Sequence, residues 1–132
     1  MSTEHSMMQL ARELRTKFPF FESYQLNEHG APTLDGASIF DMGLFLLILE
    51  EAGPAHSVAL ARLMSVTKLT IKNWIKKNQL DALAVIDSVG SGKTAHYILR
   101  DWGVYSENVY EPFRPYIRLV IKQWRLTEDG NS

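Results

Sequence analysis

The chain has 132 residues and a formal net charge of −1, a size that suits one compact domain with a substantial core. Hydrophobic residues make up 45% of it and charged residues 22%, so the composition is that of a folded globular protein and excludes a disordered or fibrous one. Cysteine is absent, which excludes disulfide bonds and thiolate metal sites and favours a reducing, cytoplasmic setting.

The first third of the chain predicts one helix and a connecting segment. Apolar residues recur at helical spacing over residues 2–17, which predicts an amphipathic helix that ends before Pro19. This segment lacks the long apolar run of a secretory signal, so we expect no export. Residues 20–38 mix turn-forming residues with a few aromatic side chains and are expected to form a connection.

Three further helices are predicted to follow in close succession. Ser38 is a candidate N-cap for an apolar helix that continues to the Gly53-Pro54 stop, and this run is too short to cross a bilayer, which takes ~20 residues. Another helix is predicted over residues 58–64 with Ser57 as a candidate N-cap, and a third over residues 67–78 with Thr67 as its N-cap. The residues of the third helix expected in the core are Leu69, Ile71, Trp74 and Ile75.

A small hairpin and a last helix are predicted to complete the chain. Alternating residues at 82–87 and 95–99 predict two strands around a glycine-containing turn. Residues 112–126 predict a helix with an apolar stripe and a basic stripe. We expect the basic stripe to face solvent. The alternatives are that it contacts flanking phosphates or pairs with acids of a partner. The basic stripe consists of Arg114, Arg118, Lys122 and Arg125.

The predicted fold class is therefore mainly α with a small β-hairpin, in one compact domain overall. Its core is expected over residues 39–101. Residues 1–38 and 102–132 are expected to be an N-terminal and a C-terminal helical extension.

Charge is distributed unevenly along the chain. Residues 52–80 contain no Asp or Glu and carry a charge of +5, which leaves −6 for the rest of the chain (−1 minus +5). The five cations of this segment are Arg62, Lys68, Lys72, Lys76 and Lys77.

Residues 60–77 resemble the helix-turn-helix pattern of bacterial and phage repressors. In that family a small Ala lets the two helices cross closely, an apolar residue occupies the turn, and Ser or Thr caps the recognition helix; Ala61, Val66 and Thr67 occupy these places. Ser65 departs from the pattern, because the family usually has Gly there in a left-handed conformation. The order helix, helix, helix, hairpin resembles that of winged helix-turn-helix domains and implies that residues 82–99 form the wing.

The helix over residues 67–78 supplies the candidate site. Its inward residues must turn the lysines and Asn73 outward. Asn73 is the candidate for reading the edge of an adenine, and Lys72 or Lys68 for contacting a guanine or a phosphate. Lys76 and Lys77 are candidates for contacts with the DNA backbone. The resemblance adds Lys93, whose wing tip (residues 88–94) would lie along the backbone or in a minor groove, unless it is a plain turn. The expected DNA-binding residues are Thr67, Lys68, Thr70, Lys72, Asn73, Lys76, Lys77 and Lys93.

These observations predict a sequence-specific regulator of transcription, a repressor that binds double-stranded DNA and is not an enzyme. The alternatives are a DNA-organising protein of plasmid partition or replication, and a winged-helix protein-interaction module whose lysines are only solvated. We expect no membrane partner and a homodimer through the terminal helices, because their apolar stripes exceed what a three-helix core needs. The stripes are Met7, Leu14 and Phe18, and Ile117, Val120 and Trp124.

The sequence does not indicate other kinds of chemistry. Residues 90–94 look like the end of a phosphate-binding loop, but Asp87 stands where that loop requires Gly. The four histidines, His5, His29, His56 and His96, are scattered in the sequence. We therefore expect no metal, no cofactor and no catalytic residues.

Overall fold

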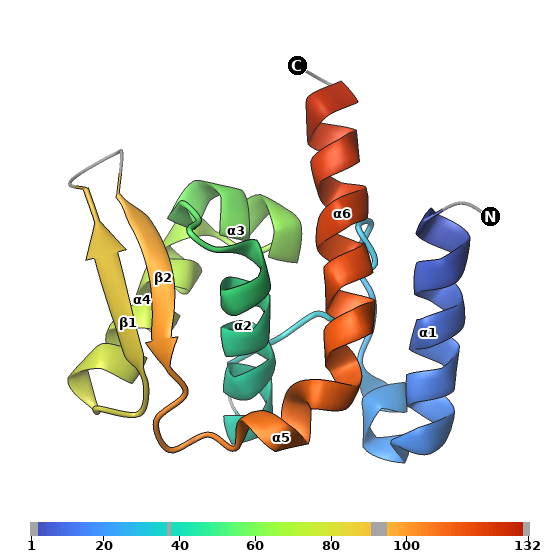
Figure 1. Ribbon diagram of the computed structural model, residues 1–132, viewed down its shortest axis with the longest axis horizontal. Coiled ribbons are helices and arrows are strands. Elements are labelled where there is room, and N and C mark those ends of the chain that lie inside the picture. Colours follow the sequence, from blue (N-terminus) through green and yellow to red (C-terminus); the bar gives the residue numbers. More distant parts are fainter. Residues whose placement is uncertain (1–2, 37, 91–94, 131–132) are drawn as a thin grey trace.

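The computed structural model describes residues 3–36, 38–90 and 95–130, and this part is mainly helical with one two-stranded antiparallel sheet. Figure 1 shows α2 at the centre, with α1 and α6 side by side on one flank and α4 and the two strands on the other. The elements are α1 (Thr3–Lys17), η1 (Pro19–Ser23), α2 (Ile39–Ala52), α3 (Ser57–Met64), α4 (Lys68–Leu80), β1 (Val85–Val89), β2 (His96–Asp101), α5 (Glu107–Tyr110), η3 (Glu111–Phe113) and α6 (Arg114–Gly130).

Helix α2 is the centre of the core. It begins as predicted at the N-cap Ser38, whose side chain accepts a hydrogen bond from the backbone N–H of Asp41. All residues 41–49 are buried, because α6 packs on one side of the helix and β2 on the other. Gly43 is required here, since a Cβ at this position would overlap the ring of Tyr110. None of the described helices is both long and apolar enough to span a bilayer.

The apolar stripes of the terminal helices face each other within one chain. Helices α1 and α6 are in contact, and Met7, Leu14, Ile117 and Val120 are all buried. The hydroxyl of Tyr116 in α6 also donates a hydrogen bond to the carbonyl of Gly30, in the segment between η1 and α2. The apolar surface from which a dimer was expected is therefore covered inside the molecule, so that argument for a homodimer does not hold.

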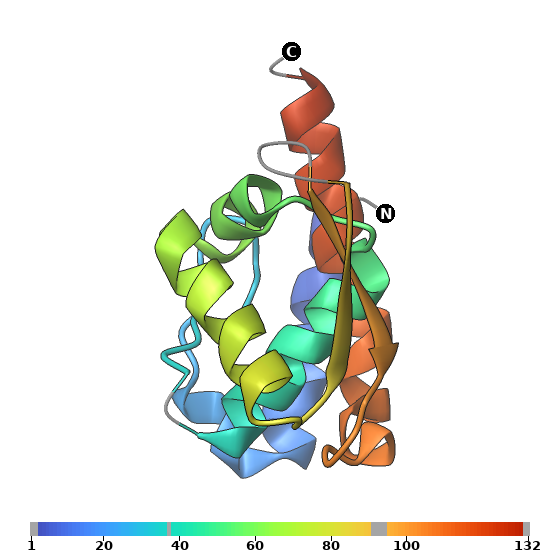
Figure 2. The same cartoon turned by 90° about the vertical axis from the view of Figure 1, so that its left-hand side faces the viewer.

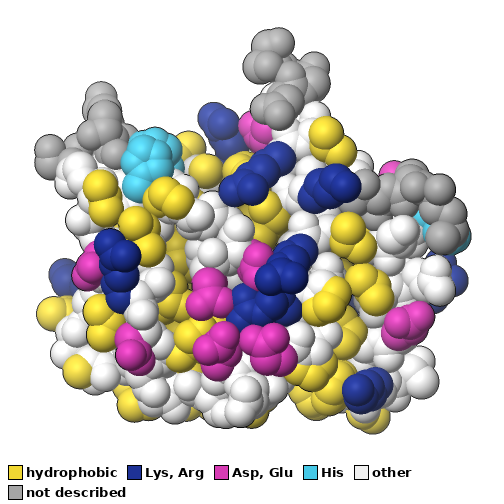
Figure 3. All heavy atoms as spheres, in the orientation of Figure 1, with side chains coloured by type: hydrophobic (Ala, Val, Ile, Leu, Met, Phe, Trp, Pro, Cys, Tyr) yellow, Lys and Arg dark blue, Asp and Glu magenta, His cyan; other side chains and the backbone are white. Residues whose placement is uncertain are grey.

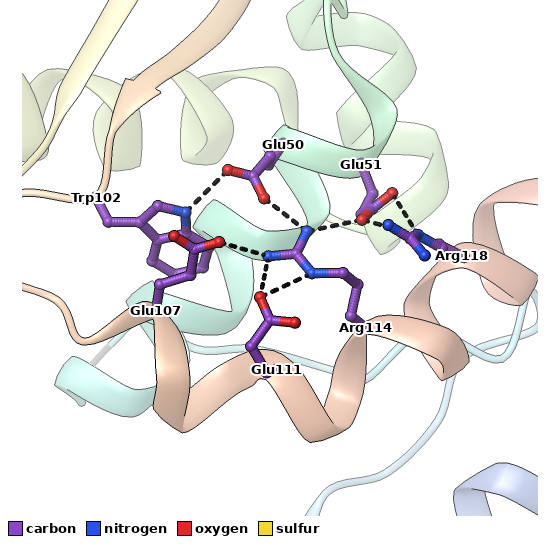
Figure 4. Close-up of polar contacts among 7 residues, drawn as sticks. All are labelled: Glu50, Glu51, Trp102, Glu107, Glu111, Arg114 and Arg118. Carbon is purple, nitrogen blue, oxygen red and sulfur yellow. Dashed lines mark hydrogen bonds and ion pairs between the residues drawn. The ribbon is translucent and has the colours of Figure 1, made fainter.

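The basic stripe of α6 does not face solvent throughout, and here the sequence-based expectation was wrong. Arg114 is only 9% exposed. Its Nη1 lies 2.6 Å from Glu50 and 2.7 Å from Glu51, and its Nη2 lies 3.0 Å from Glu107 and 2.8 Å from Glu111. Figure 4 shows these four carboxylates around the guanidinium, with Trp102 and Arg118 at the edges.

The physical reason for burying Arg114 lies at the end of α2. Glu50 and Glu51 occupy the last turn of that helix, where the helix dipole disfavours negative charge. Arg114 places a cation against both and links α2 to α5 and α6. Figure 3 shows this face of the molecule, where Lys and Arg side chains lie beside Asp and Glu side chains.

The hairpin is joined by a third segment. Strands β1 and β2 pair antiparallel, with Ile86 opposite Leu99 and an irregularity at Val85. The chain between α2 and α3 adds to β2, because Ala55 and Tyr97 exchange two backbone hydrogen bonds of 3.2 and 2.8 Å. The sheet is thereby fixed to the start of α3.

Candidate nucleic-acid interface

A tight turn of residues 65–67 connects α3 to α4. Ser65 ends α3 in the left-handed conformation, with φ 55° and ψ 44°. The next backbone N–H, that of Val66, returns to the carbonyl of Ala61 over 3.0 Å. Thr67 then caps α4, because its Oγ1 accepts a hydrogen bond of 3.1 Å from the backbone N–H of Thr70. The turn thus has the backbone conformation for which the repressor pattern uses Gly, although Ser occupies the position.

The inward face of α4 holds the helix against the core. Ile71, Trp74 and Ile75 are buried as predicted, and the ring of Trp74 packs edge-on against Phe45 of α2 at a centroid distance of 5.3 Å. Leu69 was expected in the core but is 66% exposed. The reason is helical geometry: two residues before Ile71, Leu69 lies about 200° around the helix from it, on the outer side.

The outward face of α4 carries the cations of the predicted site. Lys68, Lys72, Asn73, Lys76 and Lys77 are all exposed. Within the described residues, no Asp or Glu forms an ion pair with any of these four lysines. Their ammonium groups are therefore available to an external anion.

The two predicted threonines are placed differently from the lysines. Thr67 is exposed and Thr70 is half-buried, and their hydroxyl oxygens lie 2.8 Å apart in a hydrogen bond. Both thus belong to the cap that starts α4. This capped end also presents the free backbone N–H groups of the first helical turn, which favour an anion.

Two polar residues that the sequence analysis did not single out orient α4. Asn78 is fully buried; its Nδ2 donates to the carbonyl of Trp74 and its Oδ1 accepts from the hydroxyl of Tyr105, each over 2.8 Å. Gln79 donates from Nε2 to the carbonyl of Ile86 in β1, also over 2.8 Å. Figure 2 shows the result, with α4 and the hairpin side by side on the face toward the viewer.

Among its described residues, the hairpin adds no Lys or Arg without an ion-pair partner. Ser88, Val89 and Gly90 are exposed at its outer end. Asp87 is paired with Arg100 on the neighbouring strand at 2.9 Å. Lys93, the expected cation of the wing tip, lies outside the described residues.

The fold brings together two histidines that are far apart in the sequence. His56 and His96 have ring centroids 3.7 Å apart, because the Ala55–Tyr97 pairing joins the start of α3 to β2. Spacing along the chain contains no sign of this contact. Among the described residues, no group of three or more His, Asp or Glu side chains is placed to hold a metal ion.

Comparison with known proteins identifies no relative of this chain. No protein-family model, curated protein or solved structure matches the chain.

Proposed function

We propose that this protein binds double-stranded DNA in a sequence-dependent manner, with α4 in the major groove. The observation that carries the proposal is the outward face of α4, where four lysines without ion-pair partners among the described residues flank Asn73 on a capped helix. A helix of this kind supplies cations for phosphates and an amide for a base edge.

The surrounding elements support a winged helix-turn-helix arrangement. In chain order the core consists of α2, the paired segment at Ala55, α3, α4, β1 and β2. This order resembles that of winged helix-turn-helix domains. The contact between Gln79 and β1 sets the hairpin beside α4, where a wing would lie next to the same duplex.

The chemistry of each side chain gives it a role in this proposal. Asn73 donates and accepts on the edge of an adenine, while Lys72 or Lys68 contacts a guanine or a phosphate. Lys76 and Lys77 contact the sugar-phosphate backbone. Because occupation of a promoter is enough to block transcription, we propose that the protein acts as a repressor.

Selection of bound fragments from genomic DNA at a stated salt concentration tests this function and yields a site. Fluorescence anisotropy on that site then separates the roles of two neighbours. Asn73→Ala is expected to lose about 1–3 kcal/mol of discrimination at one base pair. Lys76→Ala is expected to weaken binding to all DNA sequences alike and to reduce the slope of log affinity against log salt concentration by about 1.

Lys122→Ala is the matched control, because Lys122 is an exposed lysine on α6, away from α4. It should leave both specificity and the salt slope unchanged. If Asn73→Ala and Lys76→Ala affect every sequence equally, the assigned roles are wrong.

A second candidate, a protein-interaction module, is favoured by two exposed leucines on α4. Leu69 is 66% and Leu80 72% exposed on the outward side of the helix, where a protein partner would cover them. Failure to bind any duplex at low salt would favour this candidate over DNA binding.

A further inference from the structure

Leu69 is an apolar side chain on the cationic outward face of α4. It is the second residue of the helix, which begins at Lys68, and it is 66% exposed. The inward face of the same helix is tightly packed, because Ile71, Trp74 and Ile75 are all buried. The core therefore does not use Leu69, and the fold leaves most of this side chain open to contact from outside the chain.

Leu69 lies on the same ridge of α4 as Asn73. Four residues apart on an α-helix, the two side chains differ by about 40° around the axis and by about 6 Å along it. The two flanking lysines, Lys72 and Lys76, are exposed beside them. A duplex that meets Asn73 therefore also meets Leu69, one turn nearer to the start of the helix, and this is the end of a groove-bound helix that reaches base edges.

The base edges of the major groove contain one apolar group that suits a leucine. This group is the C5-methyl of thymine, whereas the other groups by which the bases are distinguished there are hydrogen-bond donors and acceptors. Contact between the methyl group and a leucine removes apolar surface of both from water, which is favourable. The ammonium groups of the neighbouring lysines and the amide of Asn73 cannot replace this contact, because they are polar.

We propose that Leu69 contacts the C5-methyl group of a thymine that lies within about two base pairs of the adenine read by Asn73. The spacing follows from the separation of about 6 Å along the helix and the rise of about 3.4 Å per base pair. This inference rests on the DNA binding proposed above and names one base that the bound sites contain. The contact is uncharged, so it adds to sequence preference without altering the attraction between lysines and phosphates.

Replacement of single thymines by uracil tests the contact, because uracil pairs as thymine does and lacks only the methyl group. The duplex is the site selected from genomic DNA, and Asn73→Ala locates the adenine by its loss of discrimination. Uracil at the proposed thymine is expected to weaken wild-type binding about fourfold, which corresponds to the burial of one methyl group. The charge of the duplex is the same throughout, so the comparison is independent of salt-sensitive contacts.

Two leucine variants assign the effect to one side chain. Leu69→Ala should bind the thymine and uracil duplexes equally, because the apolar partner of the methyl group is then absent. Leu80→Ala is the matched control: Leu80 is 72% exposed on the same side of α4, but about 16 Å farther along the helix. It should keep the preference for thymine. Alanine favours a helix and both positions are exposed, so both variants are expected to fold, which circular dichroism checks.

Three results would overturn the thymine contact while DNA binding itself stands. One is a selected site without a thymine within about two base pairs of that adenine. Another is a set of uracil replacements that all leave wild-type affinity unchanged. The third is a preference for thymine that Leu69→Ala retains in full, or that Leu80→Ala loses to the same extent. Failure to bind any duplex at low salt is a different result, which overturns the proposed function and this inference together.

Discussion

Asn78 is a polar residue in a fully buried position, and its side chain is satisfied on both sides. The amide nitrogen donates to the carbonyl of Trp74 within α4, and the amide oxygen accepts from Tyr105 just before α5. The backbone carbonyl of Asn78 also accepts from the N–H of Leu83 at 2.9 Å. This one residue therefore links α4 to the segments on both sides of the hairpin.

Tyr105→Phe tests how much that link stabilises the protein. The change keeps the buried ring and removes the hydroxyl, so Asn78 Oδ1, in a fully buried side chain, loses its hydrogen-bond donor. We expect the free energy of unfolding in urea to fall by about 1–3 kcal/mol. Tyr97→Phe is the control, because no hydrogen bond of the Tyr97 hydroxyl occurs within the described residues; equal losses in both variants would contradict the role of the hydrogen bond.

Single residues also mark the limit of prediction from the sequence. The inward residues Ile71, Trp74 and Ile75 follow from helical periodicity and were predicted correctly. Arg114 and Asn78 are buried by partners 64 and 27 residues away in the sequence, and no local pattern indicates such partners. Leu69 was wrongly expected in the core, because that expectation rested on its hydrophobicity and not on its position around the helix.

At the scale of elements, the turn between α3 and α4 holds a serine in a left-handed conformation. Ser65 has a positive φ of 55°, a conformation that costs an L-residue about 1–2 kcal/mol. Ser65→Gly should relieve this strain and lose part of the gain to the greater flexibility of the unfolded chain. We expect a net rise of up to about 1 kcal/mol in the free energy of unfolding, measured in urea.

Ser65→Ala is the matched control for this turn. It removes the hydroxyl but keeps the strained conformation, so it should give no gain. A rise equal to that of Ser65→Gly would show that strain at this position is not the cause.

The junction of α2, α5 and α6 depends on Arg114. Its side chain is 11% exposed and that of Glu51 15%, so removal of the guanidinium leaves carboxylates poorly solvated and close to one another. Arg114→Met is expected to lower the free energy of unfolding by about 3–5 kcal/mol. Arg118→Met, at a side chain 62% exposed, should cost less than about 1 kcal/mol.

Neutralising the carboxylates of Glu50 and Glu51 tests whether Arg114 stabilises the protein through its charge. Addition of Glu50→Gln and Glu51→Gln to Arg114→Met should recover part of the loss, because the uncompensated negative charge is then removed. No recovery would indicate that Arg114 acts through packing of its stem and not through its charge.

The element boundaries follow the sequence more closely than the contacts between elements do. Ser38, Thr67 and the Gly53-Pro54 stop all lie at the predicted helix ends. The expected cap Ser57 was wrong, because Ser57 lies inside α3 and His56 is the N-cap residue. The last helix was predicted from residue 112, whereas residues 111–113 form a separate 3-10 turn before α6. Caps and stops are local signals, and local signals are what a sequence shows directly.

At the scale of the whole molecule, cations are distributed unevenly over the surface. The face around Arg114 pairs its cations with carboxylates (Figure 4). The lysines of α4 have no such partners among the described residues. With a formal net charge of −1, general attraction to DNA is weak, and the proposed binding depends on the local charge of α4.

The same packing changes what a dimer would require. The apolar stripes of α1 and α6 were predicted from periodicity, but only the fold shows that each covers the other. A homodimer stays a prediction and would have to use a different surface from these stripes.

Ile117→Ala distinguishes an internal stripe from a dimer interface. Ile117 is 0% exposed, and truncation of such a residue leaves a cavity that costs about 2–5 kcal/mol. We expect this loss in urea unfolding, with a midpoint that is the same at low and high protein concentration. Leu126→Ala, at an exposed leucine of the same helix, should change stability by less than about 0.5 kcal/mol. A wild-type midpoint that rises with protein concentration, and loses this dependence in Ile117→Ala, would instead show that the stripes join two chains.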